Sequence, residues 1–147
     1  MKRILPSKKI IKARVIKGAG RGKKIKVPTI NFDPSSAHGL KEGIYVCRVI
    51  IPSTGSTNSL QVSSGLVAKP YWGVLHFGPR PVFGEEDRSL EAHLFEFDDM
   101  IGDLKRADIE IYDFIRKVAN FKDKDALIAK INEDIAYARR KILSLET

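Results

Sequence analysis

The segment Ile44-Tyr45-Val46-Cys47-Arg48-Val49-Ile50-Ile51 indicates a β-strand, because it is rich in β-branched residues and is bounded by Gly43 and Pro52. Five further segments show short apolar runs, or apolar and polar residues in alternation, with Gly, Pro or Asp clusters between them. They cover residues 10–17, 60–68, 72–78, 89–97 and 107–115. About six short strands separated by turn signals predict an antiparallel barrel or sandwich.

The C-terminal part of the chain changes to a helical period. Apolar residues recur there at three- and four-residue spacings, and charged residues occupy positions between them. We therefore expect one amphipathic helix from about residue 123 to residue 145, with Asp123 or Asp125 as its N-cap. Its apolar side comprises Leu127, Ile128, Ile131, Ile135, Ala138 and Ile142, and the residues expected to face elsewhere are Lys130, Glu133, Asp134 and Arg139.

The composition is that of one globular domain. The chain has 147 residues, of which 43% are hydrophobic and 30% charged, and it has no stretch apolar enough to span a bilayer. Its basic N-terminus lacks the apolar core of a secretory signal. Cys47 is the only cysteine, which excludes an internal disulfide and fits a reducing compartment, so we expect a cytoplasmic protein. The expected organisation is a basic tail over residues 1–9 and a barrel domain with its helix over residues 10–147.

Positive charge is concentrated near the N-terminus. The net charge is +8, and eleven of the 26 Lys and Arg residues precede residue 27, whereas the first acidic residue is Asp33. Such a segment attracts a polyanion, for example a nucleotide triphosphate or nucleic acid, or it forms a solvated face that keeps the protein soluble. Charge alone does not choose between these interpretations.

Two adjacent motifs carry groups that phosphate chemistry uses. Gly18-Ala19-Gly20-Arg21-Gly22-Lys23-Lys24 mixes glycines with cations, so that backbone N–H groups can surround a phosphate; a flexible basic hairpin is the plainer interpretation. The loop is neither a Walker A loop nor a Rossmann turn, because no Gly-Lys-Ser/Thr follows and it runs into Pro28. Beyond Pro28, an extended backbone puts Thr29 and Asn31 on one side of the chain, where their side-chain oxygens are suitable ligands for Mg²⁺. The alternative is a turn in which the Thr29 and Asn31 side chains hydrogen-bond to their own backbone.

The third motif is Ser89-Leu90-Glu91-Ala92-His93-Leu94-Phe95. Alternation puts the aliphatic side chains on one face and Glu91 with His93 on the other. A carboxylate in this position can accept the proton of an attacking hydroxyl during phosphoryl transfer. An exposed strand with a Glu and a His in water has the same spacing, so both interpretations stay open.

Together these motifs resemble the riboflavin kinase family. Residues 18–31 resemble its Gly/Arg loop followed by Phe-Pro-Thr-Ala-Asn, and residues 73–84 resemble its strand and loop ending in Arg-Pro-Thr-Phe. Shorter matches are Gly43-Ile44-Tyr45, Leu90-Glu91-Ala92-His93-Leu94, Phe114-Ile115-Arg116 and Asn120-Phe121. The motifs keep the family's order over about residues 10–142, which is more specific than any one of them.

The resemblance implies a fold and an activity. The fold is a mainly β, six-stranded antiparallel Greek-key β-barrel with a C-terminal amphipathic helix. The activity is the Mg²⁺-dependent transfer of the ATP γ-phosphate to the 5′-hydroxyl of riboflavin, which gives FMN. Only about nine residues precede the first strand, so we expect a stand-alone kinase without an adenylyltransferase domain for FAD. We further expect riboflavin, FMN, ATP and ADP as partners, no nucleic acid or membrane, and a monomer.

The resemblance also implies roles for residues. Thr29 and Asn31 would hold Mg²⁺, Glu91 would be the catalytic base, and Arg116 would contact the flavin from a loop after the last strand. The implied nucleotide-binding residues are Gly18, Gly20, Arg21, Gly22, Lys24 and Pro28. The chain departs from the family's pattern next to these positions, at Lys26, Val27, Ile30 and Val82.

Two other interpretations cover the same features. One is a small β-barrel that binds nucleic acid, with the basic segment on phosphates and Tyr71, Trp72, Phe77 or Phe83 stacked on bases. The other is a barrel that binds flavin without catalysis. A mere flavin binder needs neither metal ligands nor a base, so the joint presence of Thr29, Asn31 and Glu91 argues against it.

Overall fold

The computed structural model describes residues 9–16, 29–52, 68–80, 85–95, 104–119 and 123–146. The strands in this part of the chain are β1 (Lys9–Arg14), β2 (Thr29–Phe32), β3 (Gly43–Pro52), β4 (Ala68–Arg80), β5 (Glu85–Leu94) and β6 (Arg106–Arg116). A 3₁₀ turn, η1, covers Pro34–Ala37, and one α-helix, α2, covers Lys124–Glu146. The predicted mainly β fold, with six antiparallel strands and a C-terminal helix, is confirmed.

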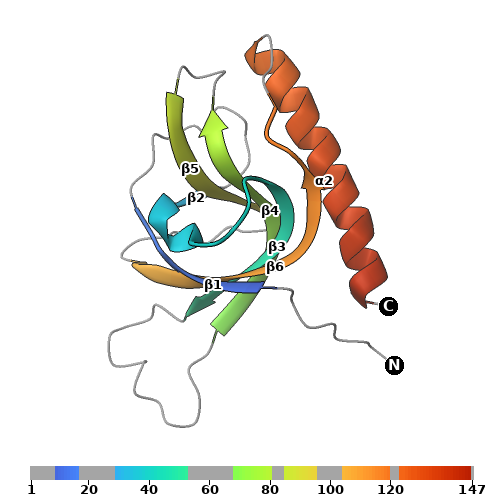
Figure 1. Ribbon diagram of the computed structural model, residues 1–147. Coiled ribbons are helices and arrows are strands. Elements are labelled where there is room, and N and C mark those ends of the chain that lie inside the picture. The colour runs from blue at the N-terminus through green and yellow to red at the C-terminus, as the bar shows by residue number, and fades with distance from the viewer. Residues whose placement is uncertain are drawn as a thin grey trace, which may run out of the picture.

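The strands form one antiparallel sheet in the order β1-β6-β3-β4-β5-β2. β3, β4 and β5 form a meander and β6 returns to lie beside β3, which is the expected Greek-key arrangement. The sheet curls into a half-barrel (Figure 1). Its edge strands meet where Val15 bridges to Phe32 and where the Ile16 amide donates to the Asn31 carbonyl at 2.8 Å. This contact holds β2 against the end of β1.

The observed strands differ in extent from the predicted ones. β4 extends the predicted segment 72–78 in both directions, and β5 begins earlier than residue 89. Of the predicted strand 60–68, only Ala68 lies within the described residues, where it begins β4. The strand β2 was not predicted as a strand, because the sequence indicated only an extended motif there. Four residues directly after a proline are too few to show a period of two.

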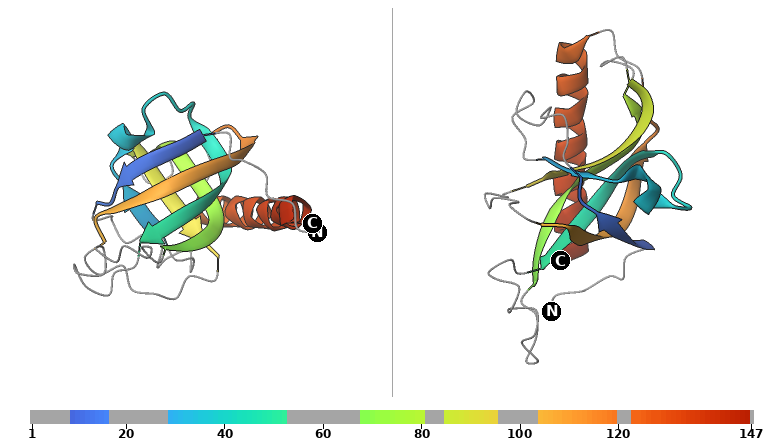
Figure 2. Two further views of the ribbon diagram at one scale, coloured as in Figure 1. Left: turned by 90° about the horizontal axis from the view of Figure 1, so that it is seen from below. Right: turned by 90° about the vertical axis from the view of Figure 1, so that its left-hand side faces the viewer.

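Alternation along the strands separates two apolar cores. The inner core fills the half-barrel with side chains from all six strands, among them Ile11, Phe32, Val49, Leu75, Leu90 and Ile109. The outer core lies between the outer face of the sheet and α2, which packs over β4 and β6 (Figure 2). It contains Ile44, Val46, Val74, Phe95, Tyr112, Ala138 and Ile142. Polar residues on the outer face therefore lie beside an apolar layer.

The helix α2 begins as predicted, but one of its residues, Asp134, lies on a different face from the one predicted. The Asp123 carboxylate accepts a hydrogen bond from the Ala126 amide at 2.8 Å and so caps the helix. The prediction that Asp134 faces away from the apolar side is wrong, because Asp134 is only 3% exposed. It follows Ile131 by three positions and precedes Ala138 by four, which places it on the buried stripe. Within the described residues, no helix is long and apolar enough to cross a membrane.

Candidate active site

The registers of three neighbouring strands bring the polar motifs together. Asn31 of β2 lies opposite Glu91 of β5, which in turn lies opposite His76 of β4. One pair further along, Thr29 lies opposite His93. The intervening residues of β2 and β5 belong to the inner core, so these polar side chains leave the sheet on its outer face. We call them the polar patch: Thr29, Asn31, His76, Glu91 and His93.

Two members of the polar patch are almost completely buried. The exposed fractions are 4% for Glu91 and 2% for His93. The interpretation of this segment as an exposed strand, with a Glu and a His in water, is therefore excluded. Burying an ionisable side chain costs free energy of folding, so buried ionisable groups that share one face of a sheet are candidates for a functional site.

Two hydrogen bonds orient the histidines of the polar patch. Thr29 Oγ1 and His93 Nδ1 are 3.0 Å apart, and Ser89 Oγ and His76 Nδ1 are 3.2 Å apart. His76, which is 8% exposed, was not among the site residues predicted from the sequence. Its only signal is the alternation along β4, and that signal becomes informative only when the pairing of β4 with β5 is known.

Thr29 and Asn31 offer oxygen ligands of the kind that Mg²⁺ prefers. Within the described residues, no group of three or more His, Cys, Asp or Glu is placed to hold a metal ion. Mg²⁺ does not need such a cage, because it keeps several waters and takes anionic ligands from nucleotide phosphates. Thr29 and Asn31 are half-buried on the edge strand β2 and share its outer face. Their donor set fits a cation that arrives with its nucleotide.

Ile30 lies between the two candidate ligands but points the other way. It is fully buried in the inner core, and it pairs with Ala92. The departure from the family's pattern at this position therefore changes the packing of the barrel interior and leaves the outer face unaltered. Cys47 also belongs to the inner core, where burial raises the pKa of its thiol, so it is neither a nucleophile nor a metal ligand.

Arg116 lies in the same cross-strand row as Glu91. The row continues from His76 to Ile44 on β3, and from Ile44 to Arg116 on β6. Three strand spacings separate Glu91 from Arg116, which is roughly 14 Å along the sheet. The prediction that Arg116 lies in a loop is wrong, because it is the last residue of β6.

The guanidinium of Arg116 is paired with Asp134 of α2. Nη2 donates to Asp134 Oδ2 at 2.7 Å and Nε donates to Oδ1 at 3.0 Å, and the two side chains are 17% and 4% exposed. Nη1 donates to the Lys117 carbonyl at 3.1 Å. A bidentate pair of this kind fixes both side chains and ties the end of β6 to the middle of α2.

The candidate nucleotide-binding residues lie outside the described residues: Gly18, Gly20, Arg21, Gly22, Lys24 and Pro28. Their role stays a prediction. The described residues that flank this segment are Ile16 and Thr29, and the Ile16 amide bonds to the Asn31 carbonyl. The described residues on both sides of this segment therefore lie next to the polar patch.

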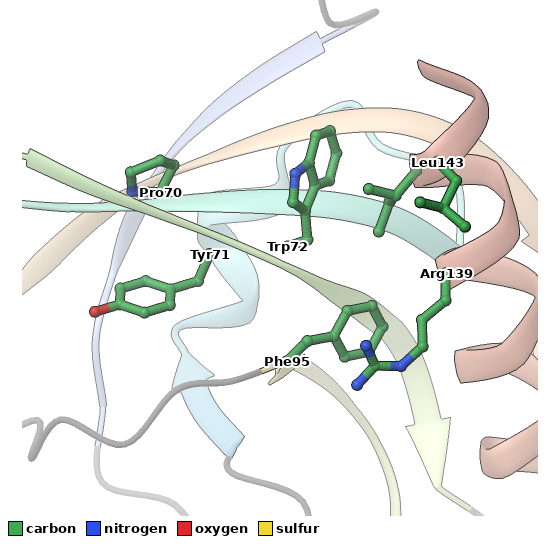
Figure 3. A pocket seen from close by; sticks show the side chains of 7 residues that line it. Pro70, Tyr71, Trp72, Phe95, Arg139 and Leu143 are labelled. Atoms are coloured by element: carbon green, nitrogen blue, oxygen red, sulfur yellow. The ribbon is translucent and has the colours of Figure 1, made fainter. Parts of the chain in front are cut away.

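A mainly apolar pocket of about 470 Å³ lies between β4 and α2 on the same outer face (Figure 3). The Arg139 guanidinium lies over the ring of Phe95, 4.4 Å from its centroid. Phe95 follows Glu91 by four positions, roughly 13 Å along an extended chain, so the pocket is distant from Glu91 and lies beyond the His93 end of the polar patch. The lining residues are Pro70, Tyr71, Trp72, Phe95, Arg139, Ile142 and Leu143.

Comparison with known proteins gives consistent matches. The family model described as riboflavin kinase, or flavokinase, matches residues 5–142. The chain is 34% identical over 126 residues to the trifunctional protein RibF/MnmA of Mycoplasmoides gallisepticum, a match that covers 84% of this chain and 17% of that protein. It is 28% identical to the RNA-binding riboflavin kinase RibR of Bacillus subtilis, over 90% of this chain and 50% of RibR. It is 28% identical to the riboflavin kinase of Homo sapiens, over 89% and 79% of the two chains. The chain thus spans half or less of the first two relatives.

Proposed function

The chain belongs to the riboflavin kinase family, and we propose that it transfers the γ-phosphate of ATP to the 5′-hydroxyl of riboflavin, which yields FMN and ADP. The observation that carries the proposal is the register of β2 and β5, which sets the buried carboxylate of Glu91 opposite Asn31 and one pair away from Thr29. Phosphoryl transfer to an alcohol requires a base beside a site for a metal-bound nucleotide, and the proximity of these three residues supports both roles.

Glu91 serves as the general base in this proposal. The O–H bond of the riboflavin hydroxyl breaks as its oxygen forms a bond to the γ-phosphorus, and the proton passes to the Glu91 carboxylate. The bond between the γ-phosphorus and the bridging oxygen breaks, and its electron pair leaves with ADP. Glu91 is 4% exposed, which supports the role because a buried base meets few competing water molecules.

Thr29 and Asn31 are the proposed ligands of Mg²⁺. When bound, Mg²⁺ supplies positive charge that offsets the negative charge of the phosphates. The two side chains bind the cation through a hydroxyl and an amide oxygen, and they orient the nucleotide relative to Glu91 across the strand pair. The segment from Gly18 to Pro28 is proposed to surround the phosphates, which is supported by the position of its two flanking residues beside the polar patch.

Arg116 is the proposed contact for the flavin. Its place in the same row as Glu91 supports this role, because riboflavin is an extended molecule with the reacting hydroxyl at one end and the ring system at the other. The pair with Asp134 holds the guanidinium in one orientation, so that little conformational entropy is lost when the flavin ring binds to it. The pocket beside Trp72 and Phe95 is the alternative place for the ring.

We further propose that the protein does not act through nucleic acid, although one relative is an RNA-binding riboflavin kinase. Of the aromatic residues considered for base stacking, Phe77 is buried in the inner core and Trp72 packs against Tyr112 at a centroid distance of 4.9 Å. Phe83 lies outside the described residues. Weak oligonucleotide binding that disappears at physiological salt would agree with this proposal, and tight, salt-resistant binding would contradict it.

The direct test of the proposed function is product analysis. The purified protein is incubated with riboflavin, Mg²⁺ and separate nucleotide triphosphates, and the flavins are separated by chromatography. We expect FMN to accumulate with ATP and to be absent when either Mg²⁺ or the nucleotide is omitted. Binding of riboflavin without any formation of FMN would favour the non-catalytic flavin binder.

A further inference from the structure

We propose that His93 is a positioning residue that orients the Thr29 hydroxyl for metal binding; the inference rests on the proposed function, in which Thr29 is a ligand of Mg²⁺. The two side chains face each other across β2 and β5, and Thr29 Oγ1 lies 3.0 Å from His93 Nδ1. His93 is 2% exposed and Thr29 is half-buried. The imidazole that contacts the hydroxyl is thus buried, and Thr29 is the more accessible of the two residues.

The direction of this hydrogen bond decides how well Thr29 can bind a cation. A threonine hydroxyl has one hydrogen and two lone pairs. When Oγ1 donates its hydrogen to Nδ1, this hydrogen bond uses neither lone pair, and the oxygen gains electron density that would strengthen a bond to a metal. When Nδ1 donates instead, one lone pair is used and the hydroxyl hydrogen is left on the metal side. Metal binding therefore favours a neutral imidazole with its hydrogen on Nε2 and an acceptor at Nδ1.

The surroundings of His93 explain why a polar ring there needs a specific partner. Along its row, the opposite residue on β4 is Val74, which pairs in turn with Val46 on β3, and both valines belong to the outer core. A polar side chain next to such a layer is costly to bury unless it is hydrogen-bonded. An aliphatic residue at position 93 would extend the apolar layer, so packing alone does not explain the histidine, and the hydrogen bond to Thr29 is a contact that requires its ring.

The backbone at His93 is held at a short distance from β4. A Cβ atom at Gly73 would lie 2.3 Å from the His93 carbonyl oxygen, so the two strands can approach this closely only because residue 73 has no side chain. The position of the imidazole relative to Thr29 is therefore set by strand pairing on both sides of β5, and not by a mobile loop. This is the geometry that a positioning residue requires.

A matched pair of amide substitutions tests the inference. His93→Asn places a carbonyl oxygen near the position of Nδ1, where it can accept from Thr29, whereas His93→Gln carries an equally polar amide one bond further out, near Nε2. The measurement is the affinity for Mn²⁺, titrated into the protein with saturating ADP and followed by electron paramagnetic resonance. We expect His93→Asn to stay near wild type and His93→Gln to weaken Mn²⁺ binding about 10- to 100-fold.

A double-mutant cycle separates this inference from the metal assignment. Thr29→Val removes the hydroxyl at similar volume and should weaken Mn²⁺ binding, and adding His93→Gln should then change the affinity by no more than about two-fold. Equal weakening by His93→Asn and His93→Gln, or an undiminished effect of His93→Gln in the Thr29→Val background, overturns the role of His93 alone. Unchanged affinity in Thr29→Val overturns the metal assignment together with it. If His93→Gln does not fold, as judged by urea unfolding, His93→Leu takes its place with the same expectations.

Discussion

Asn31 and Glu91 are directly opposite residues of the β2–β5 pair, and both side chains leave the sheet on its outer face. Directly opposite residues of an antiparallel pair have Cβ atoms only about 4.5–5.5 Å apart. The candidate metal ligand and the candidate base are therefore held together by backbone pairing, and a one-residue slip of β2 would turn Asn31 into the inner core. The site depends on register as much as on residue type.

Asn31→Ala should weaken Mg²⁺-dependent nucleotide binding. Loss of a polar contact to a charged group costs about 1.5–3 kcal/mol, or roughly 10- to 150-fold in affinity. Calorimetric titration of ADP with and without Mg²⁺ checks this, and only the affinity with Mg²⁺ should change. Because Asn31 is half-buried on an edge strand, the urea midpoint should stay near wild type. Equal affinity for ADP in both proteins at limiting Mg²⁺ would exclude Asn31 as a metal ligand.

Gly73→Ala should destabilise the protein and also reduce activity. The added Cβ would lie 2.3 Å from the His93 carbonyl oxygen, and overpacking of this kind costs about 1–3 kcal/mol. Urea unfolding and turnover are measured together. The control is Gly39→Ala, where φ is +83° and the nearest atom is the flexible end of Lys9 at 3.5 Å. That variant should lose stability through backbone strain but keep its turnover. Normal stability of Gly73→Ala would show that β4 and β5 adjust freely at this point.

Periodicity in the sequence predicted β1, β3, β4, β5, β6 and α2, whereas the four residues of β2 are too few to show a period of two. Motifs that resemble the family also indicated Thr29, Asn31 and Glu91 as candidates, and the pairing of β2 with β5 brings these three residues together. His76 was not predicted, because a single histidine in an alternating strand has no signal until pairing places it opposite Glu91. Asp134 was assigned to the wrong face of α2 for a related reason. A carboxylate is assumed to face water, and only the arginine that arrives from β6 makes burial of Asp134 tolerable.

Asp134→Leu should be strongly destabilising, and Arg116→Leu in the same protein should restore most of the loss. Removing one partner leaves a largely buried guanidinium unpaired, which costs about 3–5 kcal/mol, whereas an apolar pair of similar volume is often neutral. Urea unfolding of both variants checks this. The control is Glu133→Ala, which removes an exposed pair with Lys130 at 3.1 Å and should cost less than about 1 kcal/mol. Equal stability of Asp134→Leu and wild type would mean that the pair contributes nothing.

Arg116→Lys should raise the KM for riboflavin and leave the KM for ATP near wild type. Lysine keeps a positive charge beside Asp134 but loses the planar fork, so a contact to the flavin ring would be lost while the helix stays anchored. Trp72→Leu alters the separate pocket between β4 and α2 and should leave both KM values near wild type. Steady-state kinetics of the two variants decide between the candidate sites. The opposite pattern would place the ring in the pocket.

The proposed chemistry depends most on Glu91. The 5′-hydroxyl of riboflavin is a poor nucleophile at neutral pH, so a positioned carboxylate should assist its deprotonation during attack. Glu91→Gln keeps the size and polarity of the side chain but removes the base. General-base assistance is typically worth about 10²–10⁴-fold, so we expect kcat to fall by that order while riboflavin binding is largely retained. Turnover and flavin binding by fluorescence quenching are measured on the same preparation.

The two histidines of the polar patch are the competitors for the role of base, and they give the test its control. His76 lies opposite Glu91, and His93 lies two positions along the same strand on the same face. Each should lower kcat by less than Glu91→Gln when it is replaced by Asn, because the Asn oxygen can take the place of Nδ1 in its hydrogen bond with Ser89 or Thr29. If His76→Asn or His93→Asn abolishes turnover while Glu91→Gln stays near wild type, the base is that histidine. If none of the three lowers kcat, proton transfer to the polar patch does not limit the reaction, and the burial of Glu91 must be explained by its structural neighbours alone.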